Sequence, residues 1–161
     1  MLAALAREGT EIAALFSGSG DNISIESSFA RKPSTAALRI WREALPLRQS
    51  PAMAYLEGRG ILAASAALRF HQRTPLGPKG RARFLPAMIA AVSLDEGPIA
   101  IHRTFLTQSG NEKAFFVNPK RALGSLGEAG VRLFAPANGR LGLAEGIESA
   151  MSAYALTASR A

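Results

Sequence analysis

The sequence lacks cysteine altogether and has only two histidines, His71 and His102, in 161 residues. The chain therefore has no disulfide, no thiolate zinc site and no cysteine nucleophile, and two histidines do not complete a usual structural zinc site. A metal ion would have to be held by carboxylate oxygens, which suit Mg²⁺. A membrane-length apolar run is missing too, and so is the basic start of a signal peptide. We expect a cytoplasmic protein without zinc and without a membrane partner.

Acidic residues are scarce, and one long stretch has none. The chain carries 19 Lys and Arg against 12 Asp and Glu, a net charge of +7. No acid lies between Gly58 and Leu94, where the basic residues are Arg59, Arg69, Arg73, Lys79, Arg81 and Arg83. Such a stretch suits polyphosphate or nucleic acid, because each neutralised phosphate releases counterions. A solvated basic loop explains the same pattern equally well.

Hydrophobic residues make up 48% of the chain, which at this length allows one domain with its own core. Helical spacing over residues 2–16 is followed by "SGSGD", so we expect an N-terminal helix and a flexible linker over residues 1–33. Residues 34–161 are expected to form one α+β domain.

The predicted domain begins with two helices. Ser34 or Thr35 as N-cap predicts a helix over residues 35–45. Ser50 as N-cap, followed by Pro51 at the first helical position, predicts a second helix that ends at Gly58 or Gly60.

The rest of the domain is expected to be a mostly antiparallel sheet that ends in a strand, a turn and a helix. "ALRFHQ" predicts a strand, and "RTPLGPKGRAR" after it a loop. Two apolar runs over residues 85–106 predict a β-hairpin with its turn between Asp95 and Pro98. Further short strands are predicted at "KAFFV", "GVRLFAP" and "RLGLA", and a closing helix over residues 145–158.

Glu145 and Glu148 are the candidate catalytic residues. If a helix starts at Gly146, their three-residue spacing places both carboxylates near one face, where they could share a cation such as Mg²⁺. Two acids in a first helical turn more often just interact favourably with the helix dipole. A small hydrolase would have only these two acids and His102 to use.

Aromatic residues accompany basic ones in the segment "KAFFVNPKR". Phe115 or Phe116 beside Lys113 could stack nucleic-acid bases, although burial in the core is the commoner role of such a pair. Adding Lys113 and Arg103 to the six residues of the acid-free stretch gives the predicted phosphate contacts.

Several segments in order resemble the primase-helicase proteins of phages, plasmids and other mobile elements that carry a Toprim (topoisomerase-primase) domain. They lie within about residues 41–153 and read "AMAYLEGRGI", "LRFH", "PAMIAAVSLDEGPIAIHRTFL", "KRALGSL", "GVRLF" and "LAEGIESAMSA". The last of them is the most diagnostic. The resemblance implies the region that leads into a Toprim fold and the beginning of that fold.

In the resembling family, Glu145 matches the glutamate that ends the first Toprim strand and acts in phosphoryl transfer, close to bound Mg²⁺. Glu148 matches a neighbouring acid of the same motif. The family also has a later Asp-x-Asp pair and an upstream zinc module, whereas no acid follows Glu148 here and there is no cysteine. We therefore expect an incomplete Mg²⁺ site at Glu145 and no catalysis by this chain alone.

Three origins for such a chain stay open: a piece of a longer primase, a natural short product, or a protein that receives the missing acids from another chain. The leading hypothesis is a primase-like fragment that binds single-stranded or duplex nucleic acid. The alternative is a protein-interaction module of a mobile element, such as an inhibitor of a host nucleic-acid-processing machine. An unpaired sheet edge near the C-terminus would also allow a homodimer.

Overall fold

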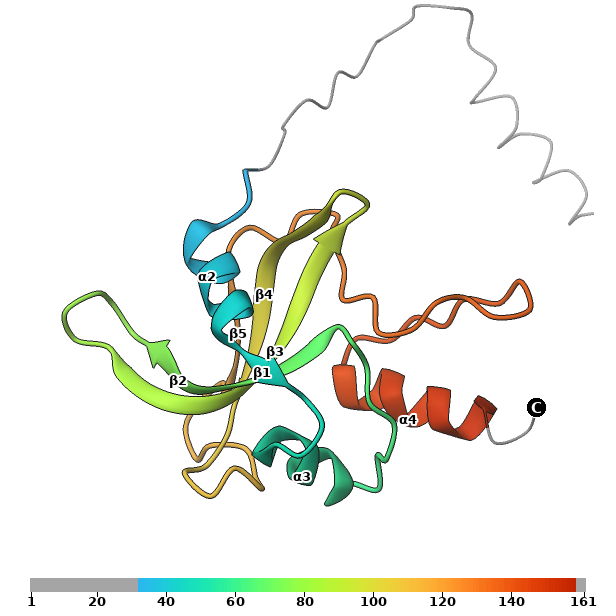
Figure 1. Ribbon diagram of the computed structural model, residues 1–161, viewed down its shortest axis with the longest axis horizontal. Helices are drawn as coiled ribbons and strands as arrows, with labels where there is room; N and C mark the ends of the chain where they lie inside the picture. Colours follow the sequence, from blue (N-terminus) through green and yellow to red (C-terminus); the bar gives the residue numbers. More distant parts are fainter. Residues whose placement is uncertain (1–31, 159–161) are drawn as a thin grey trace, which may run out of the picture. The chain divides into compact units, whose positions relative to one another are not determined.

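The computed structural model describes residues 32–158, which form three helices and a five-stranded antiparallel sheet (Figure 1). The predicted α+β class is confirmed. The predicted helix over residues 2–16 lies outside the described residues. Within residues 32–158, no helix combines the length and the apolar character that crossing a bilayer requires.

The strands follow one another in the sheet in chain order, each antiparallel to the next. The elements are α2 (Thr35–Glu43), β1 (Leu45–Pro46), α3 (Pro51–Glu57), β2 (Leu68–Leu76), β3 (Arg83–Leu94), β4 (Gly97–Phe105), β5 (Lys120–Leu123) and α4 (Ile147–Ala158).

Both predicted helix starts are confirmed by their caps. The Ser34 side chain accepts a hydrogen bond from the Ala37 N–H, and the Ser50 side chain accepts one from the Met53 N–H, each at 3.3 Å. Each cap satisfies a backbone donor that the first helical turn leaves without a partner. Gly58 is the C-cap of α3, as its place in the sequence predicts.

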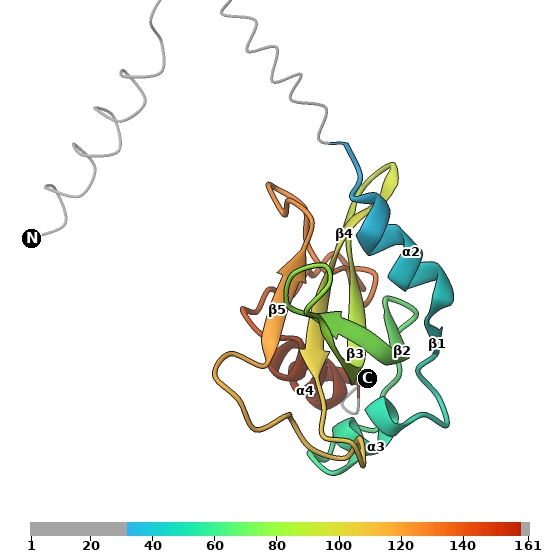
Figure 2. The same cartoon turned by 90° about the vertical axis from the view of Figure 1, so that its left-hand side faces the viewer.

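The two faces of the sheet carry separate cores because side chains alternate along each strand. Ala87 and Ile89 face α2 and pack with Ile40, whereas Met88 and Ala90 belong to the cluster that contains residues of α3 and α4. Figure 1 shows α2 and α4 on opposite sides of β3 and β4, and Figures 1 and 2 show α3 at the lower end of the strands. The sheet is thus covered by helices on both faces.

The predicted hairpin is confirmed, but the loop expected after β2 is mostly strand. β2 continues to Leu76 and β3 begins at Arg83, so that only residues 77–82 form the connection. The register shifts between His71 and Thr74, which marks a β-bulge. Bulges bend and twist a strand without ending its pairing, and a sequence pattern of period two does not reveal them.

Three predicted strands are wrong. Residues 113–117, 130–136 and 140–144 form no regular strand, and the fifth strand is instead Lys120–Leu123, which pairs with β4. Leu141 and Leu143 are 66% and 89% exposed. The pairing of these three segments is limited to isolated bridges, Lys113 with Leu106, Gly130 with Ser93 and Arg140 with Ala137, and apolar alternation without a continued ladder does not make a strand.

Candidate nucleic-acid interface

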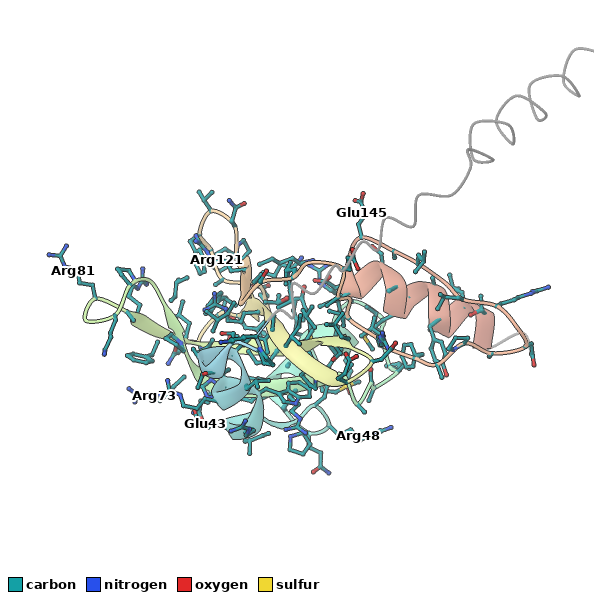
Figure 3. The ribbon with its side chains drawn as sticks, turned by 90° about the horizontal axis from the view of Figure 1, so that it is seen from above. Glu43, Arg48, Arg73, Arg81, Arg121 and Glu145 are labelled. Atoms are coloured by element: carbon teal, nitrogen blue, oxygen red, sulfur yellow. The ribbon has the colours of Figure 1, made fainter. Side chains whose placement is uncertain are left out.

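The paired ends of β2 and β3 form an extension of the sheet, residues 73–84, which we call the arm. Its strands stay paired as far as Leu76 and Arg83, and the connection turns through Gly77 and Gly80. Both glycines have positive φ, 106° and 86°, a conformation that other residues adopt at a cost. The arm reaches out past the helices at the left of Figure 1, and Figure 3 shows Arg81 at its tip.

The arm carries four exposed cations, Arg73, Lys79, Arg81 and Arg83. None of them forms a salt bridge with an acid in the part of the chain that the structure describes. Phe84 on the same arm is 53% exposed, and the Arg73 guanidinium lies over its ring at 5.4 Å. Unpaired positive charge beside an exposed aromatic ring suits phosphates and bases.

Two other predicted phosphate contacts lie away from the arm, stacked on aromatic rings. Arg69 lies 4.2 Å from the centre of the Trp41 ring and donates a hydrogen bond of 3.0 Å to the Trp41 carbonyl, so it ties β2 to α2. Arg59, just after α3, is exposed, with its guanidinium 5.0 Å from the Tyr55 ring centre. Arg59 is therefore open to a ligand, whereas the Arg69 guanidinium already has structural partners.

Arg103 is buried, with 8% of its surface exposed. Its guanidinium donates to the carbonyls of Pro75 and Ala122 at 2.9 Å and of Arg121 at 3.4 Å. Burial, and then the nearby Arg121, lower the pKa of Arg103. The side chain joins the base of the arm to β5, and we leave it out of the proposed phosphate contacts.

Lys113 belongs to a polar cluster centred on Glu148. Three side chains contact this carboxylate: Tyr55 from α3, Lys113 from the loop after β4 and Lys120 from β5. The Glu148 carboxylate accepts hydrogen bonds of 2.7 Å from the Tyr55 hydroxyl and from Lys120 Nζ, and Lys113 Nζ lies 3.2 Å from it. Burial raises the pKa of Glu148, but the bonds from Lys120 and Tyr55 outweigh it and hold this pKa at about 2. Glu148 therefore anchors α4 to the sheet as an anion.

Glu145 stands apart from this cluster. It lies just before α4, exposed, and in Figure 3 it projects away from the sheet. Both oxygens of the Glu148 carboxylate contact Tyr55, Lys113 or Lys120, whereas no hydrogen bond or ion pair within residues 32–158 joins Glu145 to this cluster. Residues 32–158 contain no group of three potential metal-ligating side chains.

The two histidines have different surroundings. Burial lowers the pKa of His102, and the positive charge of Lys120 lowers it further, so this imidazole is neutral near pH 7. His102 Nδ1 and the Thr104 hydroxyl are buried on the face of the sheet that α4 covers, and neither has a hydrogen-bond partner among the described residues. His71 Nδ1 lies 3.0 Å from the Thr74 hydroxyl and His71 Nε2 lies 3.5 Å from the Glu43 carboxylate, so this side chain links β2 to the end of α2.

Two hollows lie on either side of the loop after β4, residues 106–119. They were not predicted from the sequence. One, of about 490 Å³, is lined by Arg83 and Leu85 and reaches Phe115. The other, of about 690 Å³, lies between α3 and the loop and is lined by Arg59, Glu112 and Phe115 among others. The adjacent residues Phe115 and Phe116 were the one sequence feature that pointed to this surface. Phe115 is 87% exposed, whereas Phe116 packs on the buried Phe105.

Residues 31–133 match the model of a family described as "Domain of unknown function (DUF7146)". No curated protein and no solved structure matches the chain. The matched segment contains α2, α3 and the whole sheet, including the arm and Phe115, and it ends before Glu145 and α4. The family description names no activity.

Proposed function

Because the chain belongs to the family described as "Domain of unknown function (DUF7146)", whose description names no activity, we propose a function from its geometry: it binds nucleic acid through the arm. The observation that carries this proposal is the set of four exposed, unpaired cations on one two-stranded ribbon. A two-stranded ribbon fits a DNA groove, and its exposed Phe84 offers a surface for unpaired bases.

The placement of the other charges supports the arm as the contact surface. The basic residues outside it that were predicted to bind phosphate are partly engaged: Arg69 with Trp41, Arg103 with carbonyls and Lys113 with Glu148. On the arm, by contrast, no described acid compensates the positive charge. A phosphate backbone is the ligand that gains most from such a surface, since each contact releases counterions.

Charge reversal at the tip of the arm tests the proposal. We expect Arg81→Glu combined with Arg83→Glu to lower affinity for a labelled oligonucleotide roughly tenfold or more at moderate salt. The slope of log K against log salt should fall by about 1.4 for single strands and about 1.8 for duplex. Fluorescence anisotropy across a salt series, with and without Mg²⁺, measures both.

The matched control reverses two exposed arginines outside the arm, Arg48→Glu and Arg140→Glu, which changes the net charge by the same amount. This control should retain most of the affinity. Equal losses in the two double variants would mean that only net charge matters and would reject the arm as the contact surface.

We also propose, from the ordered resemblance to Toprim-carrying primases, that the chain is primase-like and that residues 141–153 correspond in sequence to the first Toprim motif, although residues 140–144 form no strand here. In this proposal Glu145 corresponds to the acid of phosphoryl transfer, and a cation there would be Mg²⁺. The exposure of Glu145 beside Gly146 supports an accessible carboxylate. Further metal-binding acids after Glu148 are lacking in this chain.

Catalysis by the 161 residues alone is therefore not expected. Purified protein with a single-stranded template, nucleotides and Mg²⁺ should yield no primers, because one exposed carboxylate does not hold the metal that this chemistry needs. Radiolabelled nucleotide incorporation measures this directly. Primer synthesis that disappears in Glu145→Gln would overturn the inactivity and establish a complete site.

The alternative, a protein-interaction module, draws on three exposed leucines near the C-terminus. Leu141, Leu143 and Leu156 are 66%, 89% and 70% exposed. Exposed apolar side chains of this size are candidates for contact with another protein. This reading predicts a stoichiometric complex that Leu143→Asp breaks, together with negligible oligonucleotide binding at physiological salt.

A further inference from the structure

We propose that the hollow between α3 and the loop after β4 is a base site, which binds one unpaired nucleobase with a preference for guanine. The base stacks on Phe115, its edge meets the Glu112 carboxylate, and its phosphate lies near Arg59. This inference rests on the proposed binding of nucleic acid and adds to it the kind of nucleotide and the place where it is read.

The hollow has the size and the walls of a ligand site. Its volume of about 690 Å³ lies within the range of small-molecule sites, about 300–1,000 Å³. One wall comes from α3 and its C-cap, with Tyr55, Gly58 and Arg59, and the other from the loop, with Glu112 and Phe115. An aromatic ring, a carboxylate and a guanidinium therefore face one space.

Phe115 is the stacking surface. Its side chain is 87% exposed although its neighbours Ala114 and Phe116 pack into the core. Stacking a base on one face of such an exposed ring removes apolar surface from water, which favours binding. Aromatic stacking is also the usual way in which proteins hold unpaired bases.

Glu112 provides the preference among bases. Its carboxylate is exposed and has no salt bridge within residues 32–158. An ionised carboxylate only accepts hydrogen bonds, and guanine presents two adjacent donors, N1–H and N2–H, that match its two oxygens. Adenine and cytosine each present a single amino group on that edge, so they match less well.

Positive charge lies at the rim next to this edge. The Arg59 guanidinium lies over the Tyr55 ring. The Tyr55 hydroxyl donates a hydrogen bond to one oxygen of Glu148, and Lys113 Nζ lies 3.2 Å from that same oxygen. Arg59 forms no salt bridge with a described acid. A phosphate attached to the bound nucleoside therefore meets an unpaired guanidinium, with a lysine nearby.

Gly110 holds the two walls at a set distance. It has φ of 79°, and a Cβ at this position would overlap the Cβ of Pro51, the first residue of α3. The loop is braced further by the Ser109 hydroxyl, which donates to the Asn111 side-chain oxygen at 2.6 Å. The base site is thus preformed by direct contact between loop and helix, which lowers the cost of ordering it on binding.

The base site is continuous with the arm. The smaller hollow, on the other side of Phe115, is lined by Arg83 of the arm and by Leu85. Glu112 and Phe115 line both hollows. A single strand whose phosphates contact Arg81 and Arg83 can therefore pass Phe115 and place a base between the loop and α3.

The test is titration of the full 161-residue chain with GMP, AMP, CMP and UMP, followed by amide chemical shifts in ¹⁵N-labelled protein. We expect shifts centred on Arg59, Glu112 and Phe115, with GMP bound most tightly. Phe115→Ala should lower the affinity for every nucleotide roughly tenfold. Glu112→Gln should remove most of the preference for GMP over AMP.

Val117→Ala is the matched control, since Val117 is in the same loop, 81% exposed, and lines neither hollow. It should bind GMP like the unmodified chain. Unchanged affinity in Phe115→Ala, or shifts that lie elsewhere, would overturn the base site, and equal affinity for all four nucleotides would overturn the guanine preference. The arm variant with oligonucleotides tests the proposed function separately, so a failure of the base site is distinguishable from a failure of the arm as the contact surface.

Discussion

Replacing Glu148 with glutamine is expected to lower the free energy of unfolding at pH 7 by about 3 kcal/mol, the value that a pKa held near 2 instead of 4.5 implies. Glutamine keeps the size of the side chain but not its charge. Lys113 and Lys120 would then lie half-buried beside a neutral amide, and the tie between α4 and the sheet would weaken. Urea denaturation followed by circular dichroism measures the change.

The pH dependence of this effect has a definite sign. Because the pKa of Glu148 is lower in the folded protein than in the unfolded chain, its stabilisation is fully present above pH 4.5. It is lost as the pH falls from 4.5 towards 2. The stability of the unmodified chain should therefore fall more steeply over this range than that of Glu148→Gln, and the two curves should converge at the acid end.

Glu145→Gln is the natural control, because Glu145 is exposed and precedes the same helix. It should change stability by no more than about 0.5 kcal/mol at any pH. Parallel curves for the unmodified chain and Glu148→Gln would show that Glu148 does not hold the sheet and α4 together as an anion.

Arg103→Met is expected to destabilise the fold by about 1–3 kcal/mol. Methionine fills much of the space, but it leaves the carbonyls of Pro75, Arg121 and Ala122 without the donors that the Arg103 guanidinium supplies. Lysine should rescue little, since one ammonium does not reproduce the planar fork that reaches all three. The loss should appear as a lower urea midpoint with an unchanged m-value.

Arg48→Met serves as the control, since it removes the same charge from an exposed position. A phosphate contact at Arg103 would give a different result, namely weaker oligonucleotide binding at unchanged stability. That outcome would return Arg103 to the nucleic-acid interface.

Sequence alone predicted the local features of the fold. The N-caps Ser34 and Ser50, the proline that starts α3 and the hairpin turn after Leu94 all act through groups within a few residues of one another. Such signals are complete in a short segment, so their positions agree with the structure. The acid-free basic stretch could also be identified from the sequence, because counting charged residues does not require knowing which segments contact one another.

The sequence did not show which residues of one chemical type are buried and which are exposed. Arg81 and Arg103 are both arginines near apolar runs, yet one is exposed on the arm and the other is buried against three carbonyls. Phe115 and Phe116 are adjacent, and only the second packs on Phe105. Burial depends on which segments meet across the sheet, and no local pattern records that.

The sequence by itself determined the α+β class, the helix starts, the central hairpin and the surplus of positive charge. Only the tertiary structure decided that the basic loop is a paired arm, that Glu148 joins α4 to the sheet while Glu145 stays exposed, and that Arg59, Glu112 and Phe115 face one hollow. The physical reason is range. Capping and turn formation involve neighbours in the chain, whereas ion pairs and hollows arise between residues tens of positions apart.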